Sequence, residues 1–267
     1  MRRVRAIVAR RRILGLLVVR DLKVKYASSA LGYFWTVLEP LLMGLVYWFV
    51  FTKIFDRGGG VAREPYIVFL LAGLLPWNWA SQVISASTRS ITSEARLVRS
   101  TNLPREIWVL RTVASKFAEF LFSIPVLIIF LVATQTGVNW RIIYWPVAIG
   151  MQWVALLGIA LILAPVTVLM TDIQNIIRVV LRMLFYMCPV LYGAHAVLTN
   201  PRIPGWIKQV YEFNPFTAIL SMYRGAIFPD QHPGWGLILH GGTSCLVLLV
   251  TGAYVFRSLE RSVLKEV

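Results

Sequence analysis

The sequence has few charged residues for its length. Only 15% of its 267 residues are Asp, Glu, Lys or Arg, and 58% are hydrophobic. Soluble domains average about 25% charged residues. The charges collect between apolar runs that are long enough to cross a bilayer. This composition excludes an ordinary soluble domain and predicts an integral membrane protein.

Residues and motifs that carry chemistry are also scarce. The two cysteines, Cys188 and Cys245, lack the spacing of a disulfide framework or a metal site, and His195, His232 and His240 are scattered. No phosphate-binding G-x-x-x-x-G-K-S/T loop, H-E-x-x-H or G-x-S-x-G motif occurs. The predicted cytoplasmic loops contain no close pair of carboxylates. We therefore expect a chain that is not an enzyme and that has no metal or cofactor of its own.

Positive charge is the exception to this scarcity. Lys and Arg number 27 against 12 Asp and Glu, which gives a net charge of +15. In a soluble protein this excess would indicate nucleic-acid binding. In a membrane protein it is typical of cytoplasmic loops. We expect contact with membrane lipids and no nucleic-acid partner.

Six apolar runs have the length of transmembrane helices. They cover residues 33–54, 66–88, 117–135, 142–170, 176–192 and 235–256. The predicted fold class is an all-α integral membrane protein with six transmembrane helices, an N-terminal amphipathic interface helix, a cytoplasmic coupling helix and short re-entrant outer helices. The predicted organisation is a cytoplasmic N-terminus with the interface helix over 1–32, one six-span domain over 33–257 and a cytoplasmic tail over 258–267.

The distribution of cations predicts the orientation of these spans. Six spans place both termini on one side of the membrane. With cytoplasmic termini, 20 of the 27 Lys and Arg residues lie inside and seven lie outside. This bias favours a multi-pass protein with both ends in the cytoplasm.

The segment 10–27 has the pattern of a helix that lies on the membrane surface. Apolar residues recur at helical spacing, and cations occupy another face. One interpretation is a plain topological anchor. The other is that Arg20, Lys23 and Lys25 meet a negatively charged, lipid-linked substrate at the cytoplasmic surface.

A polar loop with helical character joins the second and third predicted spans. Its sequence over 97–111 is LVRSTNLPREIWVLR. Pro104 suits the first turn of a helix, Asn102 is a candidate N-cap, and Glu106 complements the helix dipole. These signals predict a short helix that begins near Leu103 and presents Leu103, Ile107 and Leu110 on one side. Because so short a helix is marginal in water, we expect it to pack either on a partner or on the protein's own spans.

Two other segments depart from simple spans. Glu39 lies about two turns inside the first span, where a carboxylate is costly unless it is paired or hydrated, and Pro40 can kink the helix. Glu39 therefore either pairs near the interface or faces a polar translocation path. Residues 193–233 contain five prolines and short helical patterns, which favour short outer helices that act as a gate or as a surface cover.

Taken in order along the chain, these residues resemble a known family. The motifs are R-D-L-K-V-K-Y (Arg20 to Tyr26), L-G-Y-F-W (Leu31 to Trp35), E-P (Glu39-Pro40), N-L-P-R-E (Asn102 to Glu106), T-D-I-Q-N-I (Thr171 to Ile176), C-P-V-L-Y (Cys188 to Tyr192), N-P-F (Asn214 to Phe216) and Y-R (Tyr223-Arg224). They resemble the permease subunits of type-2 ATP-binding-cassette exporters, in the subgroup that exports O-antigen, teichoic acid or galactan. One departure is Thr171, where the family often has Arg.

The resemblance implies partners that the chain itself does not contain. Two permeases, here a homodimer, would assemble with two separate ATPase subunits that bind ATP and Mg. The loop helix would be the coupling helix, seated in a groove of the ATPase. The candidate coupling residues are Leu97, Leu103, Pro104, Arg105, Glu106, Ile107 and Leu110.

The resemblance also implies a substrate and a location. The expected activity is export of a polyprenyl-diphosphate-linked polysaccharide across the bacterial cytoplasmic membrane, through a pore at the permease dimer interface. The candidate pore-lining residues are Tyr33, Phe34, Trp35, Glu39, Tyr47, Trp48 and Phe51. The alternatives are an exporter of a drug or small lipid, a membrane enzyme acting on polyprenyl phosphates, and a passive channel.

Overall fold

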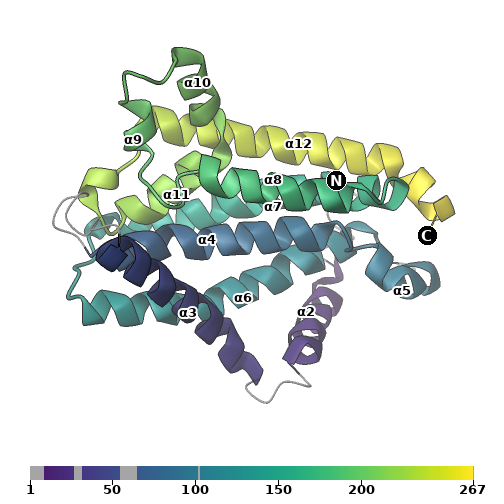
Figure 1. Ribbon diagram of the computed structural model, residues 1–267. Helices are drawn as coiled ribbons and strands as arrows, with labels where there is room; N and C mark the ends of the chain where they lie inside the picture. Colours follow the sequence, from purple (N-terminus) through teal and green to yellow (C-terminus); the bar gives the residue numbers. More distant parts are fainter. Residues whose placement is uncertain (1–8, 27–31, 55–64, 102, 267) are drawn as a thin grey trace.

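The computed structural model describes residues 9–26, 32–54, 65–101 and 103–266, and these residues contain helices and no strand. Among these described residues, four helices are long and apolar enough to cross a membrane, one of them with its leading 3₁₀ turn. They are α4 (Tyr66–Ser87), α6 (Glu106–Ala133), α7 (Tyr144–Leu169) with the turn η5 (Trp140–Ile143), and α12 (Trp235–Glu266). These helices run roughly alongside one another and form the body of the molecule (Figure 1). These helices confirm the expected all-helical membrane fold.

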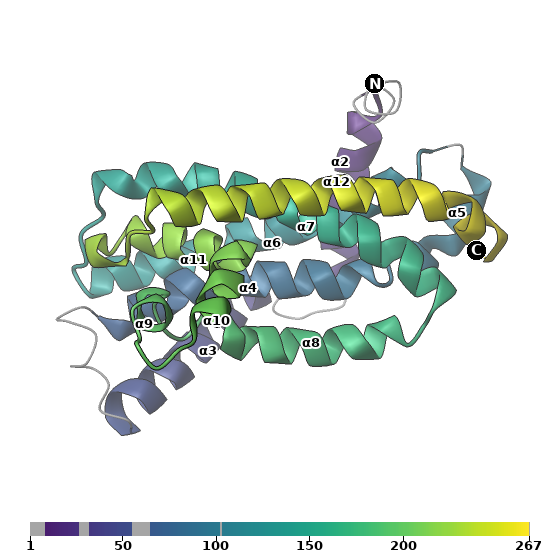
Figure 2. The ribbon, with the colours of Figure 1, turned by 90° about the horizontal axis from the view of Figure 1, so that it is seen from above.

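The other two predicted spans correspond to shorter helices. Residues 33–54 form the turn η1 (Gly32–Phe34), α3 (Trp35–Phe49) and the π-helical turn η2 (Val50–Ile54). Residues 176–192 correspond to α8 (Ile173–Met187), which ends before Cys188. Figure 2 shows α8 on the opposite side of the bundle from α12. Neither helix meets the length of a full span, so a count of six stays a prediction.

Shorter helices mark the two ends of the bundle. One end, called here the α5 end, carries the turn η4 (Thr92–Glu94), α5 (Ala95–Ser100) and the end of α12 (Figures 1 and 2). The opposite end, called the α10 end, carries α9 (His195–Leu198), α10 (Gly205–Phe213) and the turn η6 (Pro229–Gln231). The helix α2 (Arg11–Tyr26) packs on α6. The predicted surface segment is thus helical, and α12 continues as a helix through most of the predicted tail.

Glycines allow α7 and α12 to pack closely. A Cβ atom on Gly158 would overlap the backbone of Leu248, and one on Gly252 would overlap the backbone of Gly158. Small residues at a helix crossing let two backbones approach, which increases van der Waals contact between helices within lipid. This contact pairs the third long helix with the last one.

The helix α11 (Pro215–Gly225) closes the α10 end and is buried along nearly its whole length. Its Arg224 is only 1% exposed and donates to backbone carbonyl oxygens of other segments. Nε donates to Phe69 of α4 at 3.1 Å, Nη1 donates to Pro189 and Tyr192 at 2.6 Å each, and Nη2 donates to Val190. One guanidinium therefore joins α11 to α4 and to the non-helical chain that follows α8.

The glycine crossing between α7 and α12 can be tested by substitution. We expect Gly252→Leu to lower the stability of the purified protein by about 1–3 kcal/mol, because the new side chain must displace the backbone of α7. The measurement is thermal unfolding in detergent. Gly242→Leu is the matched control, since a Cβ at Gly242 of the same helix meets nothing within 4 Å. Equal stability of the two variants would contradict the packing argument.

Candidate functional site

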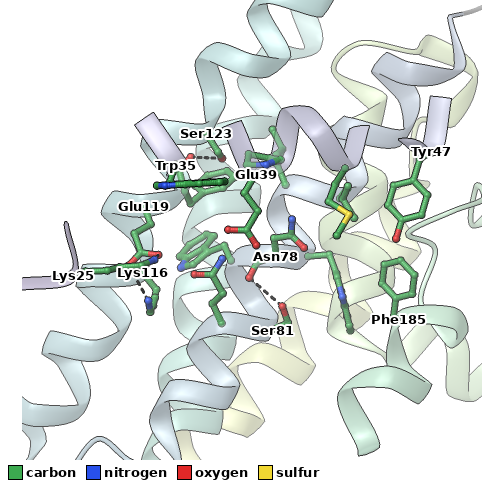
Figure 3. A pocket seen from close by; sticks show the side chains of 18 residues that line it. Lys25, Trp35, Glu39, Tyr47, Asn78, Ser81, Lys116, Glu119, Ser123 and Phe185 are labelled. Carbon is green, nitrogen blue, oxygen red and sulfur yellow. Dashed lines mark hydrogen bonds and ion pairs between the residues drawn. The ribbon is translucent and has the colours of Figure 1, made fainter. Parts of the chain in front are cut away.

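A pocket of about 330 Å³ lies where α3 crosses α4 and α6 (Figure 3). Its walls are Lys25 of α2; Trp35, Glu39, Pro40, Met43 and Tyr47 of α3; Leu74, Leu75, Trp77, Asn78, Trp79, Ser81 and Gln82 of α4; Lys116, Glu119, Phe120 and Ser123 of α6; and Phe185 of α8. The walls combine aromatic rings with carboxylate, ammonium, amide and hydroxyl groups. Such a mixture is typical of a ligand site rather than of a lipid-facing surface.

The α3 wall follows from the helical period. Trp35, Glu39, Met43 and Tyr47 are spaced four residues apart and share one face of the helix. The Glu39 carboxylate points into the pocket, toward Asn78 (Figure 3). Within the part of the chain that the structure describes, Glu39 makes no ion pair or hydrogen bond. The pocket therefore contains one carboxylate that is available to a ligand.

The second carboxylate of the pocket is held by cations. Glu119 is 9% exposed and receives the ammonium groups of Lys25 at 2.8 Å and Lys116 at 2.7 Å. Because Lys25 belongs to α2 and the other two residues belong to α6, this triad attaches α2 to the third predicted span. A buried carboxylate needs such partners, since an unpaired charge away from water is costly.

A larger hollow of about 1020 Å³ adjoins the pocket on the side of the α5 end. The two cavities share Lys25, Ser81, Gln82, Lys116 and Glu119 as lining residues. The rest of the hollow is lined by Arg20, Asp21, Val24, Ser85, Ala86, Arg89, Ser90, Ser93, Glu94, Arg111, Thr112, Ser115 and Leu181. Five of its residues are cationic and three are acidic, so the hollow has an excess of positive charge.

The structure brings together only some of the cations predicted to meet a substrate. Arg20 and Lys25 line the hollow, whereas Lys23 is exposed and does not line it. Arg20 is paired with Glu94 at 2.5 Å, and Lys25 with Glu119. The sequence did not indicate these internal ion pairs, because their partners lie 74 and 94 residues away.

Only some of the predicted pore-lining residues line the pocket. Trp35, Glu39 and Tyr47 line the pocket, whereas Phe34 and Trp48 are exposed outside it. The side chains of Tyr33 and Phe51 lie outside the described ones. The walls supplied by α4 and α6 were missed. The signal that would have found them is a set of polar residues at helical spacing within apolar spans, namely Asn78, Ser81, Gln82, Lys116, Glu119 and Ser123.

The predicted loop helix over Leu103–Leu110 is wrong in its bounds. The short helix is α5, Thr101 and residues 103–105 are not helical, and α6 begins at Glu106. Ile107 is completely buried in the protein, and Leu110 is half-buried. The alternative, packing against the protein's own spans, is the one observed. The physical reason is that these apolar residues continue the buried face of α6.

The remaining candidate coupling residues that the structure describes are partly buried. Leu97 and Leu103 pack against the core, and Pro104, Arg105 and Glu106 are half-buried. The candidate N-cap, Asn102, lies outside the described residues. The outer surface of this segment is instead basic and polar, with Arg96, Arg99 and Ser100 exposed on α5 and Thr92 and Ser93 exposed on η4.

The triad around Glu119 predicts how α2 is retained. We expect Glu119→Gln to increase the rate of amide hydrogen exchange in α2 by about threefold to tenfold, because both lysines lose their carboxylate and α2 opens more often. The measurement is hydrogen–deuterium exchange of the purified protein. Glu39→Gln removes a carboxylate from the same pocket without breaking an ion pair, and it should leave exchange in α2 unchanged. Identical exchange in both variants would show that the triad does not hold α2.

Comparison with known proteins places most of this architecture in one family. The model of the ABC-2 type transporter family matches residues 13–228. An O-antigen export system permease protein, RfbA, of Klebsiella pneumoniae is 30% identical and covers 93% of each chain. RfbA of Myxococcus xanthus is 26% identical over 97% of this chain and 96% of its own. The polysialic acid transport protein KpsM of Escherichia coli is 23% identical over 93% of each chain. This multi-pass membrane protein, whose described residues include four long apolar helices, belongs to the ABC-2 type transporter family.

Proposed function

We propose that this chain is the permease subunit of an ATP-driven exporter that moves a polyprenyl-diphosphate-linked polysaccharide across the bacterial cytoplasmic membrane. The names of its relatives, which refer to O-antigen export and polysialic acid transport, support polysaccharide as the cargo. The observation that carries the proposal further is the pocket between α3, α4 and α6, together with the cationic hollow that adjoins it.

The pocket suits a chain of sugars. The rings of Trp35, Tyr47, Trp77 and Phe185 present flat apolar surface, against which the apolar face of a sugar ring is removed from water. The Glu39 carboxylate accepts hydrogen bonds from sugar hydroxyls, and amides such as Asn78 both donate and accept. Because each sugar makes the same kinds of contact, successive units can follow one another along these walls.

The hollow suits the other end of the substrate. A diphosphate is expensive to place in hydrocarbon and needs cations and hydrogen-bond donors. Arg20, Arg89 and Arg111 supply guanidinium groups, and the hydroxyl groups of Ser85 and Ser93 can donate to phosphate oxygens. The substrate then enters from the α5 end, which faces the cytoplasm in the orientation favoured by the positive-inside bias.

The working unit contains two copies of the chain. On α8, Arg178 and Arg182 are exposed together with the apolar residues Ile176, Val179 and Met183. Cations on a lipid-facing helix are costly, whereas they are accommodated next to a partner or a hydrated path. We assign α3 and α8 as the first and fifth spans, which complete the set of six, and we place their exposed faces against the second copy.

Two separate ATPase subunits, with ATP and Mg, drive transport. The docking segment on this chain is η4–α5, whose exposed face carries Arg96 and Arg99. Its apolar side, including Val98, is already covered by the permease itself. The matching surface of the ATPase is therefore acidic and polar, and charge complementarity fixes the register of the contact.

Transport of a defined glycan tests the proposed cargo. In vesicles that contain the permease–ATPase complex, we expect Trp35→Ala and Glu39→Gln to lower glycan export about tenfold, because each removes a contact that a sugar makes in the pocket. Phe34→Ala removes a neighbouring ring outside the pocket and should retain export. Efflux of drugs or small lipids without glycan export, or turnover by the permease alone, would overturn the proposal.

Charge reversal tests the docking segment. We expect Arg96→Glu with Arg99→Glu to reduce co-purification of the ATPase about tenfold or more, since two attractive contacts with an acidic surface become repulsive. Arg202→Glu with Lys208→Glu makes the same change of charge at the α10 end and should leave assembly intact. Undiminished co-purification of the α5 variant would exclude this face as the contact.

A further inference from the structure

Four charged side chains meet where α2, η4 and α6 converge beside the hollow. Arg111 of α6 contacts Asp21 of α2 through Nε at 2.5 Å and Glu94 of η4 through Nη1 at 3.0 Å. Arg20 of α2 contacts the same Glu94 at 2.5 Å, and the Ser115 hydroxyl donates to Asp21 at 3.1 Å. We call Arg20, Asp21, Glu94 and Arg111 the charge cluster.

Three members of the charge cluster are well shielded, Arg20 is 37% exposed, and the two carboxylates are not equally bonded. The side chains of Arg111, Glu94 and Asp21 are 12%, 18% and 21% exposed. Asp21 accepts both the Arg111 Nε–H and the Ser115 hydroxyl. Glu94 accepts one hydrogen bond, from Arg20 Nη2 at 2.5 Å, and its contact with Arg111 Nη1 is an ion pair without hydrogen-bond geometry. Glu94 is therefore the more exchangeable of the two carboxylates.

Glu94 is also the member that belongs to the docking segment. It is the last residue of η4, and α5 begins at the next residue. Its carboxylate is attached to α2 through Arg20 and to α6 through Arg111. A change at Glu94 is thereby transmitted to Arg96 and Arg99 through two to five residues of chain.

The arginines of the charge cluster face the hollow in which an anion would compete for them. Arg20, Arg111 and Glu94 all line it, beside the hydroxyl groups of Ser90 and Ser93. A guanidinium binds phosphate oxygens with the same planar, forked geometry as it binds a carboxylate. A diphosphate in the hollow would offer more oxygens and more negative charge than the single Glu94 carboxylate.

We propose that Glu94 acts as an internal stand-in for the anionic headgroup of the substrate: it holds Arg20 and Arg111 in the resting state, and a diphosphate displaces it and thereby frees the η4–α5 segment. Binding of the substrate is thereby transmitted to the ATPases through the η4–α5 segment, on which they dock. This inference rests on the proposed function. It assigns Glu94 and Arg111 as positioning residues, since they act on ATP hydrolysis through other groups.

The test uses the permease–ATPase complex in lipid vesicles, with a sugar-free polyprenyl diphosphate as the probe. For the wild type we expect the lipid to raise ATP hydrolysis. For Glu94→Gln we expect a rate without lipid about threefold to tenfold above that of the wild type, and little further stimulation, because the neutral amide releases the arginines. Glu94→Asp retains the charge and should restore stimulation. Asp172→Asn, which neutralises an exposed carboxylate at the same end, should behave as the wild type.

Three outcomes would overturn the inference. One is a Glu94→Gln complex whose basal and stimulated rates equal those of the wild type. Another is loss of ATPase co-purification in Glu94→Gln, which would make Glu94 a docking residue. The third is a wild type that exports glycan but ignores the diphosphate, which leaves the proposed function standing and removes the headgroup as the trigger. A complex that neither exports glycan nor responds to the lipid would instead contradict the proposed function as well.

Discussion

A single guanidinium supplies the hydrogen bonds that the backbone lacks where α8 ends. Pro189 and Val190 are buried, and a buried carbonyl oxygen outside a helix needs a hydrogen-bond donor from the protein. Arg224 donates to the carbonyls of Pro189, Val190 and Tyr192 and also to that of Phe69. The arrangement requires Gly73 on α4, because a Cβ there would overlap the guanidinium. These bonds connect the non-helical chain that follows α8 with α4 and α11.

The opposite end of the bundle is held by a different kind of contact. At the α5 end, α2, η4 and α6 are joined by ion pairs between partly exposed side chains, including Arg20–Glu94 and Lys25–Glu119. No ligand from solution can replace a carbonyl group that is bonded to a fully buried cation. A partly exposed carboxylate, by contrast, can be replaced by another anion. The α10 end is thus built as one unit, and the α5 end is built from contacts that a charged ligand can exchange. This difference fits the proposed export, in which the substrate and the ATPases both act at the α5 end.

The sequence predicts the parts of the fold that are determined by the length of an apolar segment. It does not predict the parts that are determined by contacts between residues far apart in the chain. The apolar runs of α4, α6, α7 and α12 predict these helices because their length is set by the bilayer. From the sequence, Arg224 is one of the seven cations on the predicted outer side and part of a Y-R motif. Its hydrogen bonds cannot be predicted, because its four acceptors become neighbours through tertiary structure. The apolar residues around Ile107 have helical spacing. That spacing fits a helix that is bound by a partner and equally a helix that is buried in the protein. Periodicity describes a face, and only packing determines what covers it.

The candidate site, too, depends on tertiary contacts that the sequence does not predict. Its two cavities also differ in charge. The spacing of Trp35, Glu39 and Tyr47 predicts one wall, but the pocket exists because α4 and α6 bring further polar groups opposite that wall. Acids and bases are equal in number in the pocket, while bases are in excess in the hollow. A neutral glycan and a diphosphate have the complementary charges. In the proposed export, the two parts of one substrate are therefore sorted between two adjoining spaces before the ATPases act.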